Sequence, residues 1–94
     1  MNIRRLVLDV DKAMARPSLI EIGEAISACP GVAALNITVG EIDVETIGMD
    51  VTIEGEELDY EQICRAIENT GAVVHSIDQL VAGSRLIESV RRIR

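Results

Sequence analysis

The order of apolar and polar positions along the chain predicts four β-strands. Residues 3–10 (IRRLVLDV) are rich in β-forming side chains, and their alternation is typical of a strand with one more polar face. Period-two alternation returns in residues 32–44 and again in residues 49–54, with acidic residues between the two stretches. This pair is predicted to form a hairpin. A fourth strand is predicted from about residue 72 to residue 80.

Helix signals fall between these strands. Ser18 precedes an apolar stripe of helical spacing and is followed three residues later by Glu21, which is the pattern of a capping box. Asp59 and Gln62 stand in the same relation at the start of a second stripe. A proline–glycine pair ends the first helix, and Gly71 is suited to end the second.

The predicted element order is βαββαβ, and the two halves of the chain resemble each other. AISACPGVAALNI (25–37) and AIENTGAVVHSI (66–77) share a helix end, a glycine and a strand start. Two interleaved βαβ halves form a four-stranded antiparallel sheet with both helices on one face. The sequence therefore predicts an α+β, ferredoxin-like domain over residues 1–83.

The last eleven residues, 84–94, form a separate amphipathic and basic tail. Their apolar side chains recur near helical spacing with arginines between them, which predicts a short C-terminal helix. A helix of this length has little stability alone and needs a surface on which to dock. Arg85, Leu86 and Val90 are therefore predicted to lie at an interface, with the tail on its own chain or on a neighbouring one.

One face of the predicted sheet has no helix over it, so it must meet water, a ligand or another subunit. Most of its positions are polar, but Val7 and Ile77 interrupt that polarity. Because apolar positions on an open sheet are typical of an interface, Ile77 and the neighbouring His75 are predicted to lie at a contact between subunits.

Composition limits the class of protein. Hydrophobic residues make up 48% of the 94 residues, but Tyr60 is the single aromatic residue, so the core must be aliphatic. No apolar run approaches the roughly 18 residues that span a membrane, and the N-terminal run is too short for a signal peptide. We expect a cytoplasmic protein without a membrane partner. Cys29 and Cys64 form no CxxC pair and are expected to be buried thiols.

The charge is divided unevenly along the chain. The net charge is −7, with 15 acidic and 5 basic side chains in residues 1–83 and four arginines against one glutamate in residues 84–94. An acidic body repels phosphate backbones, and one aromatic residue cannot supply a stacking platform, which argues against a nucleic-acid partner. The basic tail is suited to pair with an acidic body.

The cluster of His75, Ser76 and Asp78 suggests catalysis at first sight. Adjacent residues of a strand point to opposite faces, so His75 is expected to lie away from both Ser76 and Asp78. No glycine-rich phosphate loop or nucleophile elbow is present. No catalytic residue is predicted.

Acidic residues offer a candidate metal site. Asp9 and Asp11 would place two carboxylates on one face at the end of the first strand, and Ca²⁺ or Mg²⁺ would be the cation of choice for oxygen ligands. No EF-hand loop is present, and the alternative is that these side chains are simply solvated.

Several stretches resemble a known family: LNIT, the EID turn, and the AIE–G–HSID–VAG pattern of residues 66–83. The chain resembles, over nearly its whole length, the archaeal domain-of-unknown-function family 211. The resemblance implies small ferredoxin-like proteins of unassigned activity that form ring-like homo-oligomers, and an archaeal source. A weaker resemblance to heavy-metal-associated domains fails at the loop DVDKAMARPS, which lacks their CxxC ligands.

These observations favour a non-enzymatic, self-associating cytosolic domain that binds a divalent cation or small ligand at acidic subunit interfaces. Two alternatives stay open. One is a regulatory module that senses a small molecule between paired sheets. The other is an enzyme of unknown type with an intersubunit site.

Overall fold

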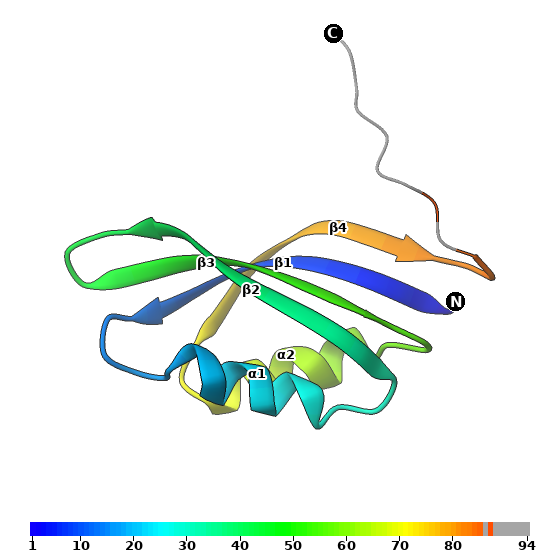
Figure 1. Cartoon of the computed structure of the whole chain (residues 1–94), viewed down its shortest axis with the longest axis horizontal. Coiled ribbons are helices and arrows are strands. Elements are labelled where there is room, and N and C mark those ends of the chain that lie inside the picture. Colours follow the sequence, from blue (N-terminus) through cyan, green and yellow to red (C-terminus); the bar gives the residue numbers. More distant parts are fainter. Residues whose placement is uncertain (86, 88–94) are drawn as a thin grey trace, which may run out of the picture.

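The computed structural model describes residues 1–85 and residue 87, and its elements follow the order βαββαβ (Figure 1). The strands are β1 (Ile3–Ala13), β2 (Val32–Ile42), β3 (Thr46–Gly55) and β4 (Val73–Ala82), and the helices are α1 (Leu19–Ser27) and α2 (Tyr60–Asn69). The predicted order is confirmed. The predicted tail helix lies outside the described residues.

The four strands form one antiparallel sheet in the order β2-β3-β1-β4. Both helices lie on the same side of it (Figure 1), with α1 against β2 and α2 against β4. The fold is therefore the predicted ferredoxin-like α+β arrangement. β1 extends three residues beyond the predicted end because it stays paired with β3 as far as Ala13 and Thr46.

The core between sheet and helices is aliphatic, as expected from the composition. The central strands β1 and β3 and both helices contribute its fully buried members. These are Leu6, Leu8, Val10, Met49, Val51, Ile53, Ile22, Ile26, Ile63 and Ile67. Lys12 is the one buried charged residue among those described, and its Nζ donates hydrogen bonds at 3.1 Å to the carbonyl oxygens of Ala13 and Met14.

Both predicted helix caps are present. The Glu21 N–H donates to Ser18 Oγ at 3.1 Å, and the Ser18 N–H donates to Glu21 Oε1 at 3.0 Å, which completes the capping box. This hydrogen bond to the Ser18 backbone lowers the pKa of Glu21. At α2, the Gln62 N–H donates to Asp59 Oδ1 at 3.1 Å.

Two glycines allow the start of β2 and the end of β3 to approach closely. Gly31 has a φ of 86°, and a Cβ there would lie 2.1 Å from the carbonyl oxygen of Glu56. A Cβ at Gly55 would lie 1.9 Å from the carbonyl oxygen of Gly31. Only glycine fits either position without a backbone shift.

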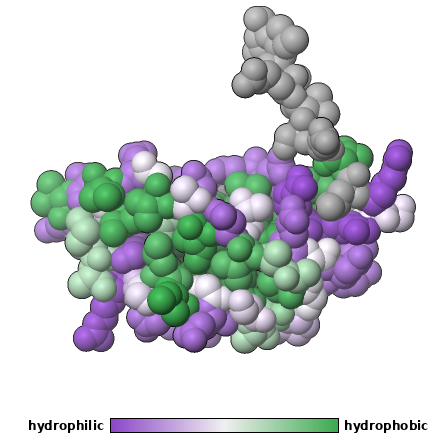
Figure 2. Space-filling view, viewed as in Figure 1, coloured by the Kyte–Doolittle hydropathy of each residue, from purple (hydrophilic) through white to green (hydrophobic). Residues whose placement is uncertain are grey.

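Apolar side chains also gather outside the core, on the side of the molecule that carries β2 (Figure 2). The exposed fractions are 39% for Val39 and 71% for Ile42 on β2, 87% for Val44 in the following turn, and 74% for Ile20 on α1. We refer to these four residues as the β2 apolar patch. Exposed groups of large apolar side chains are found on surfaces that meet a partner.

The two cysteines have different environments. Cys29 is buried as expected, but Cys64 is only half-buried, because it lies on α2 beside Tyr60 and not on the core stripe of that helix. A hydrogen bond with Cys64, together with burial, raises the pKa of Tyr60 to about 12.

This environment yields a spectroscopic prediction. The single tyrosine should ionise near pH 12 in the folded protein, as followed by ultraviolet absorbance, and Cys64→Ala should move the midpoint toward the usual value of about 10. Between about pH 10 and pH 12, Tyr60 keeps its proton in the folded state but loses it in the unfolded state. The free energy of unfolding should therefore fall as the pH rises through this range. An unchanged midpoint in Cys64→Ala would show that the hydrogen bond with the thiol does not raise the pKa of Tyr60.

Candidate functional site

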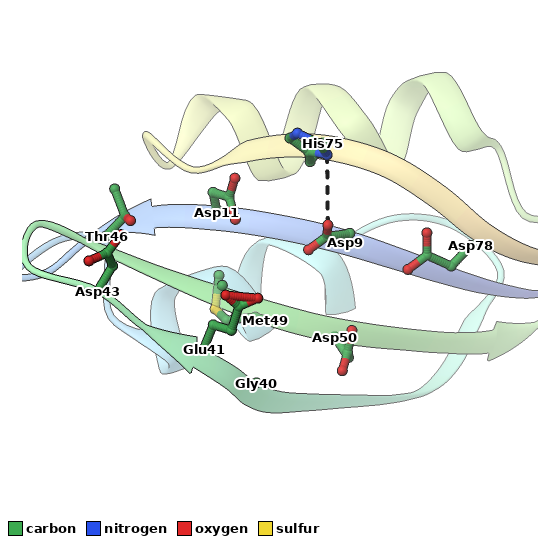
Figure 3. Close-up of a pocket in the computed structure, with 11 residues that line it drawn as sticks. Asp9, Asp11, Gly40, Glu41, Asp43, Thr46, Met49, Asp50, His75 and Asp78 are labelled. Atoms are coloured by element: carbon green, nitrogen blue, oxygen red, sulfur yellow. Dashed lines mark ion pairs between the residues drawn. The ribbon is translucent and has the colours of Figure 1, made fainter.

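The uncovered sheet face carries a broad acidic depression of about 570 Å³ (Figure 3). It lies where β1 ends, β4 begins and the β2–β3 hairpin turns. Its charged lining residues, here called the acidic face, are Asp9, Asp11, Glu41, Asp43, Asp50, Asp78 and His75. Among the described lining residues, His75 is the only one that can carry a positive charge.

Strand register brings these carboxylates together. Asp9 on β1 is directly opposite Asp50 on β3, and Asp50 is opposite Thr38 on β2. Residues directly opposite in an antiparallel pair have Cα atoms about 4.5–5.5 Å apart, and like charges there are destabilising. The centre of the face therefore holds two carboxylates of like charge in adjacent strands.

A glycine separates the next pair of carboxylates. Gly48 on β3 is opposite Asp11 on one side and Glu41 on the other. A Cβ at Gly48 would lie 3.5 Å from Asp11 Oδ1 and 3.7 Å from Glu41 Cβ. The missing side chain leaves open space between two acidic residues from different strands.

His75 lies over the acidic face and points to Asp9 (Figure 3). Its Nδ1 is 3.7 Å from Asp9 Oδ2, and its side chain is 66% exposed. Protonated, it would form an ion pair with Asp9 in water, where such pairs contribute about 0–1 kcal/mol.

The expectation that His75 and Asp78 point to opposite faces is wrong, because β4 is bulged twice. In the pairing with β1, Asp9 and Val10 are opposite Ser76 and Val74, which leaves His75 as an extra residue. Val7 and Leu8 are opposite Gln79 and Ile77, which leaves Asp78 as a second one. Each bulge interrupts the alternation, so both residues line the same depression.

Because of the same bulges, Ile77 does not lie on the open face of the sheet, contrary to the prediction. It is opposite Leu8, a fully buried residue, so it lies on the helix side of the sheet and not on the open face. It is 42% exposed there because β4 is an edge strand.

The Ser76 hydroxyl is not paired with His75. Its Oγ donates to Asp78 Oδ1 at 3.0 Å, on the exposed surface. A nucleophile needs a base within hydrogen-bond reach and a site that excludes water. The arrangement therefore offers no activated nucleophile at this position.

Asp9 and Asp11 share the open face of β1, as their spacing predicts, and both line the depression. The described residues hold no group of three or more His, Cys, Asp or Glu side chains that could bind a metal ion. Since Ca²⁺ takes six to eight oxygen ligands, water or a second chain would have to complete its shell here.

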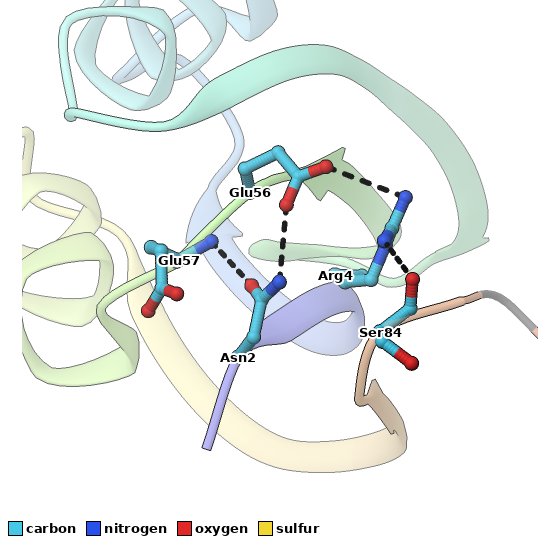
Figure 4. Close-up of polar contacts among 5 residues, drawn as sticks. All are labelled: Asn2, Arg4, Glu56, Glu57 and Ser84. Atoms are coloured by element: carbon cyan, nitrogen blue, oxygen red, sulfur yellow. Dashed lines mark hydrogen bonds and ion pairs between the residues drawn. The ribbon is translucent and has the colours of Figure 1, made fainter.

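Arg85 is exposed and directly follows Ser84, which takes part in a polar cluster that joins both ends of the described chain (Figure 4). Arg4 Nη1 donates to the Ser84 carbonyl oxygen at 3.0 Å, and Arg4 Nη2 lies 3.4 Å from Glu56 Oε1. Asn2 Nδ2 donates to Glu56 Oε2 at 3.0 Å. Leu86 and Val90, the other predicted interface residues of the tail, lie outside the described residues.

Sequence reasoning noted acidic residues but missed how Asp50, Glu41 and Asp78 converge with Asp9. The positions of Asp50 and Glu41 relative to β1 can be found from strand register. Asp50 is opposite Asp9 in the pairing of β3 with β1, and Glu41 is opposite Gly48 in the pairing of β2 with β3. No local signal marks the bulge at Asp78.

Fold and site together define a small α+β domain of ferredoxin-like topology with an open acidic sheet face. Within the part of the chain that the structure describes, no helix has the length and apolar character needed to cross a membrane. The sequence profile of domain-of-unknown-function family 211, described as Uncharacterized ArCR, matches residues 4–94. The chain belongs to this family.

A relative comes from the archaeon Methanocaldococcus jannaschii. The chain is 44% identical to "Uncharacterized protein MJ0319" over 90 residues, which cover 96% of this chain and 92% of the relative. The suggested family is thereby confirmed, and the family has no assigned activity.

Proposed function

We propose that this protein is a non-enzymatic, self-associating cytosolic domain whose acidic face binds a divalent cation where subunits meet. The observation that supports this most directly is the convergence of six carboxylates from four strands and a turn on one uncovered surface. No lysine or arginine is among the described residues that line it.

Electrostatics favour a cationic ligand at this surface. Like-charged pairs directly across neighbouring strands cost about 0.2–1 kcal/mol each, and Asp9 and Asp50 form such a pair. A bound cation removes that repulsion and gains attraction from both carboxylates. Ca²⁺ and Mg²⁺ suit the donor set, which is all oxygen apart from His75.

Incomplete coordination within one chain links cation binding to self-association. A single chain presents its carboxylates on an open surface and forms no group that could enclose an ion among its described residues. A second subunit facing the same surface would add donors and exclude water. The protein would then bind cations more tightly as an assembly than as a monomer.

The enzyme alternative has less support from the geometry. His75 and Asp9 form the one arrangement that resembles an acid–base pair, but the two side chains are 66% and 39% exposed. Catalytic groups generally work in sites that exclude water, and neither of these side chains is shielded from it.

Thermal unfolding with added metal tests the cation site. If Ca²⁺ or Mg²⁺ binds with a Kd of about 1 mM, then 10 mM of the ion should raise Tm by roughly 6–11 °C. The double substitution Asp9→Asn and Asp11→Asn should abolish this gain. The matched control is Glu24→Gln with Glu61→Gln, which removes the same charge from the two helices and should preserve the gain. Indifference of the wild-type Tm to both ions would contradict the proposed cation site.

A further inference from the structure

The basic tail, residues 84–94, is a part of the chain to which the proposed function gives no role. It begins at a fixed place, because the Gly83 N–H donates to the Asn2 carbonyl oxygen at 2.8 Å. The Ser84 carbonyl oxygen also accepts a hydrogen bond from Arg4 Nη1 at 3.0 Å. Figure 1 shows this end of β4 beside the start of β1, away from both helices. The chain beyond Ser84 therefore starts at the rim of the sheet.

Charge makes the open face of the sheet the surface that fits the tail. The tail carries four arginines against one glutamate, while residues 1–83 carry 15 acidic and 5 basic side chains. Six of those acidic side chains gather on the acidic face, with no lysine or arginine among its described lining residues. Glu54 and Glu56, which lie closer to the start of the tail, already pair with Arg5 and Arg4. The acidic face is therefore where the arginines of the tail gain the most.

Distances along the strands match the length of the tail. Asp9 is six residues from Ile3 along β1, which is about 20 Å at 3.3 Å per residue. A helix from Ser84 to Arg94 is about 15 Å long, before the length of an arginine side chain is added. In the helical form that its sequence predicts, the tail thus brings its last three arginines to the near border of the acidic face.

On its way, the tail would cross the uncharged half of the open face. Val7 on β1 is directly opposite Thr52 on β3, and both alternate with buried residues of the helix side. Ile93, nine residues beyond Ser84, would lie about 13 Å along a helical tail, and Val7 lies about the same distance from the start of β1. Ile87, an apolar tail residue that the structure describes, is 59% exposed, so apolar surface is left to be covered.

We propose that the basic tail packs on the open face of its own sheet, with Ile93 over Val7 and the last three arginines against Asp9 and Asp78 as built-in counter-ions. Tethering favours the tail of the same chain, since a directly attached segment has an effective concentration in the millimolar range. The tail then competes with the divalent cation. This competition rests on the proposed function, whereas the contact itself does not.

Disulfide cross-linking tests the contact without any cation. Thr52→Cys with Ile93→Cys, in a Cys64→Ala background, keeps every charge of the tail and of the acidic face. Oxidation at low micromolar concentration should form an intramolecular disulfide in most molecules, as measured by mass spectrometry. The matched control is Gln62→Cys with Ile93→Cys, which moves the first thiol to the start of α2, on the helix side of the sheet. Its yield should be at least about fivefold lower.

Calcium titration of the full chain tests the competition. Arg91→Gln with Arg92→Gln should lower the Kd for Ca²⁺ by at least about threefold, because the ion no longer displaces arginines from the carboxylates. The matched control is Arg16→Gln with Arg65→Gln, which removes the same charge from two exposed arginines outside the tail. It should change the Kd by less than about twofold. Isothermal titration calorimetry gives both values.

The results separate the tail contact from the cation site. A control pair that cross-links as readily as Thr52→Cys with Ile93→Cys, or a disulfide that joins two chains, would overturn the contact of the tail with its own sheet. Efficient cross-linking in a protein that binds no Ca²⁺ would support the contact and overturn the competition together with the proposed cation site. If Ca²⁺ binds but Arg91→Gln with Arg92→Gln leaves its Kd unchanged, the competition alone is overturned.

Discussion

Gly31→Ala is expected to lower the free energy of unfolding by about 4 kcal/mol. A non-glycine residue at a φ of 86° costs roughly 1–2 kcal/mol, and a Cβ placed 2.1 Å from the Glu56 carbonyl oxygen forces a backbone shift of a further 1–3 kcal/mol. Urea unfolding followed by far-ultraviolet circular dichroism measures the change. The loss should be one of the largest for any single methyl group added to this chain.

Two other glycines serve as controls for this effect. Gly83 has a φ of 124° with nothing within 4 Å of a built Cβ, so Gly83→Ala should cost only the conformational part, about 1 kcal/mol. Gly23 lies inside α1 with ordinary contacts to Leu35 and Ile37, so Gly23→Ala should stabilise by about 0.5–1 kcal/mol. Equal losses for Gly31→Ala and Gly83→Ala would mean that β2 and β3 do not approach as closely as described.

Ile67→Ala should cost about 3 kcal/mol of unfolding free energy. Ile67 is fully buried on α2 between the helix and the sheet, and its truncation leaves a cavity in the core. A domain of this size is stable by about 5–15 kcal/mol, so the loss is a large share of the total. Chemical denaturation provides the value.

Ile20→Ala is the matched control for Ile67→Ala. The side chain is the same, but it is 74% exposed on α1, so its loss should change stability by less than about 0.5 kcal/mol. A comparable loss at both positions would show that Ile20 is covered, as it would be if a second copy of the chain packs on the β2 apolar patch.

The fold could be predicted because its signals are local. Ser18 with Glu21 and Asp59 with Gln62 mark the helix starts, and both caps form in the structure. Alternation along β1 and β3 reflects burial of one face only, which holds when helices cover a single side of a sheet.

The geometry of the acidic face could be predicted only in part. Asp9 and Asp11 share a face through simple alternation, but the approach of Asp50 to Asp9 depends on strand register. Ile77 and Asp78 lie on other faces than simple alternation predicts, because two bulges shift the alternation of β4 twice within five residues. A bulge depends on how a strand pairs with its neighbour, and no residue in this stretch announces it.

The polar cluster around Arg4 has a practical consequence for engineering this protein. The Gly83 N–H donates to the Asn2 carbonyl oxygen at 2.8 Å, so the start of β1 and the end of β4 are held side by side, remote from the acidic face. Fluorophores, affinity tags or a fused reporter domain attached near either position would project away from the acidic face. A short linker joining Gly83 to Asn2 would also allow a circular permutant with new termini in the turn around Val44, which would place a reporter directly beside the carboxylates.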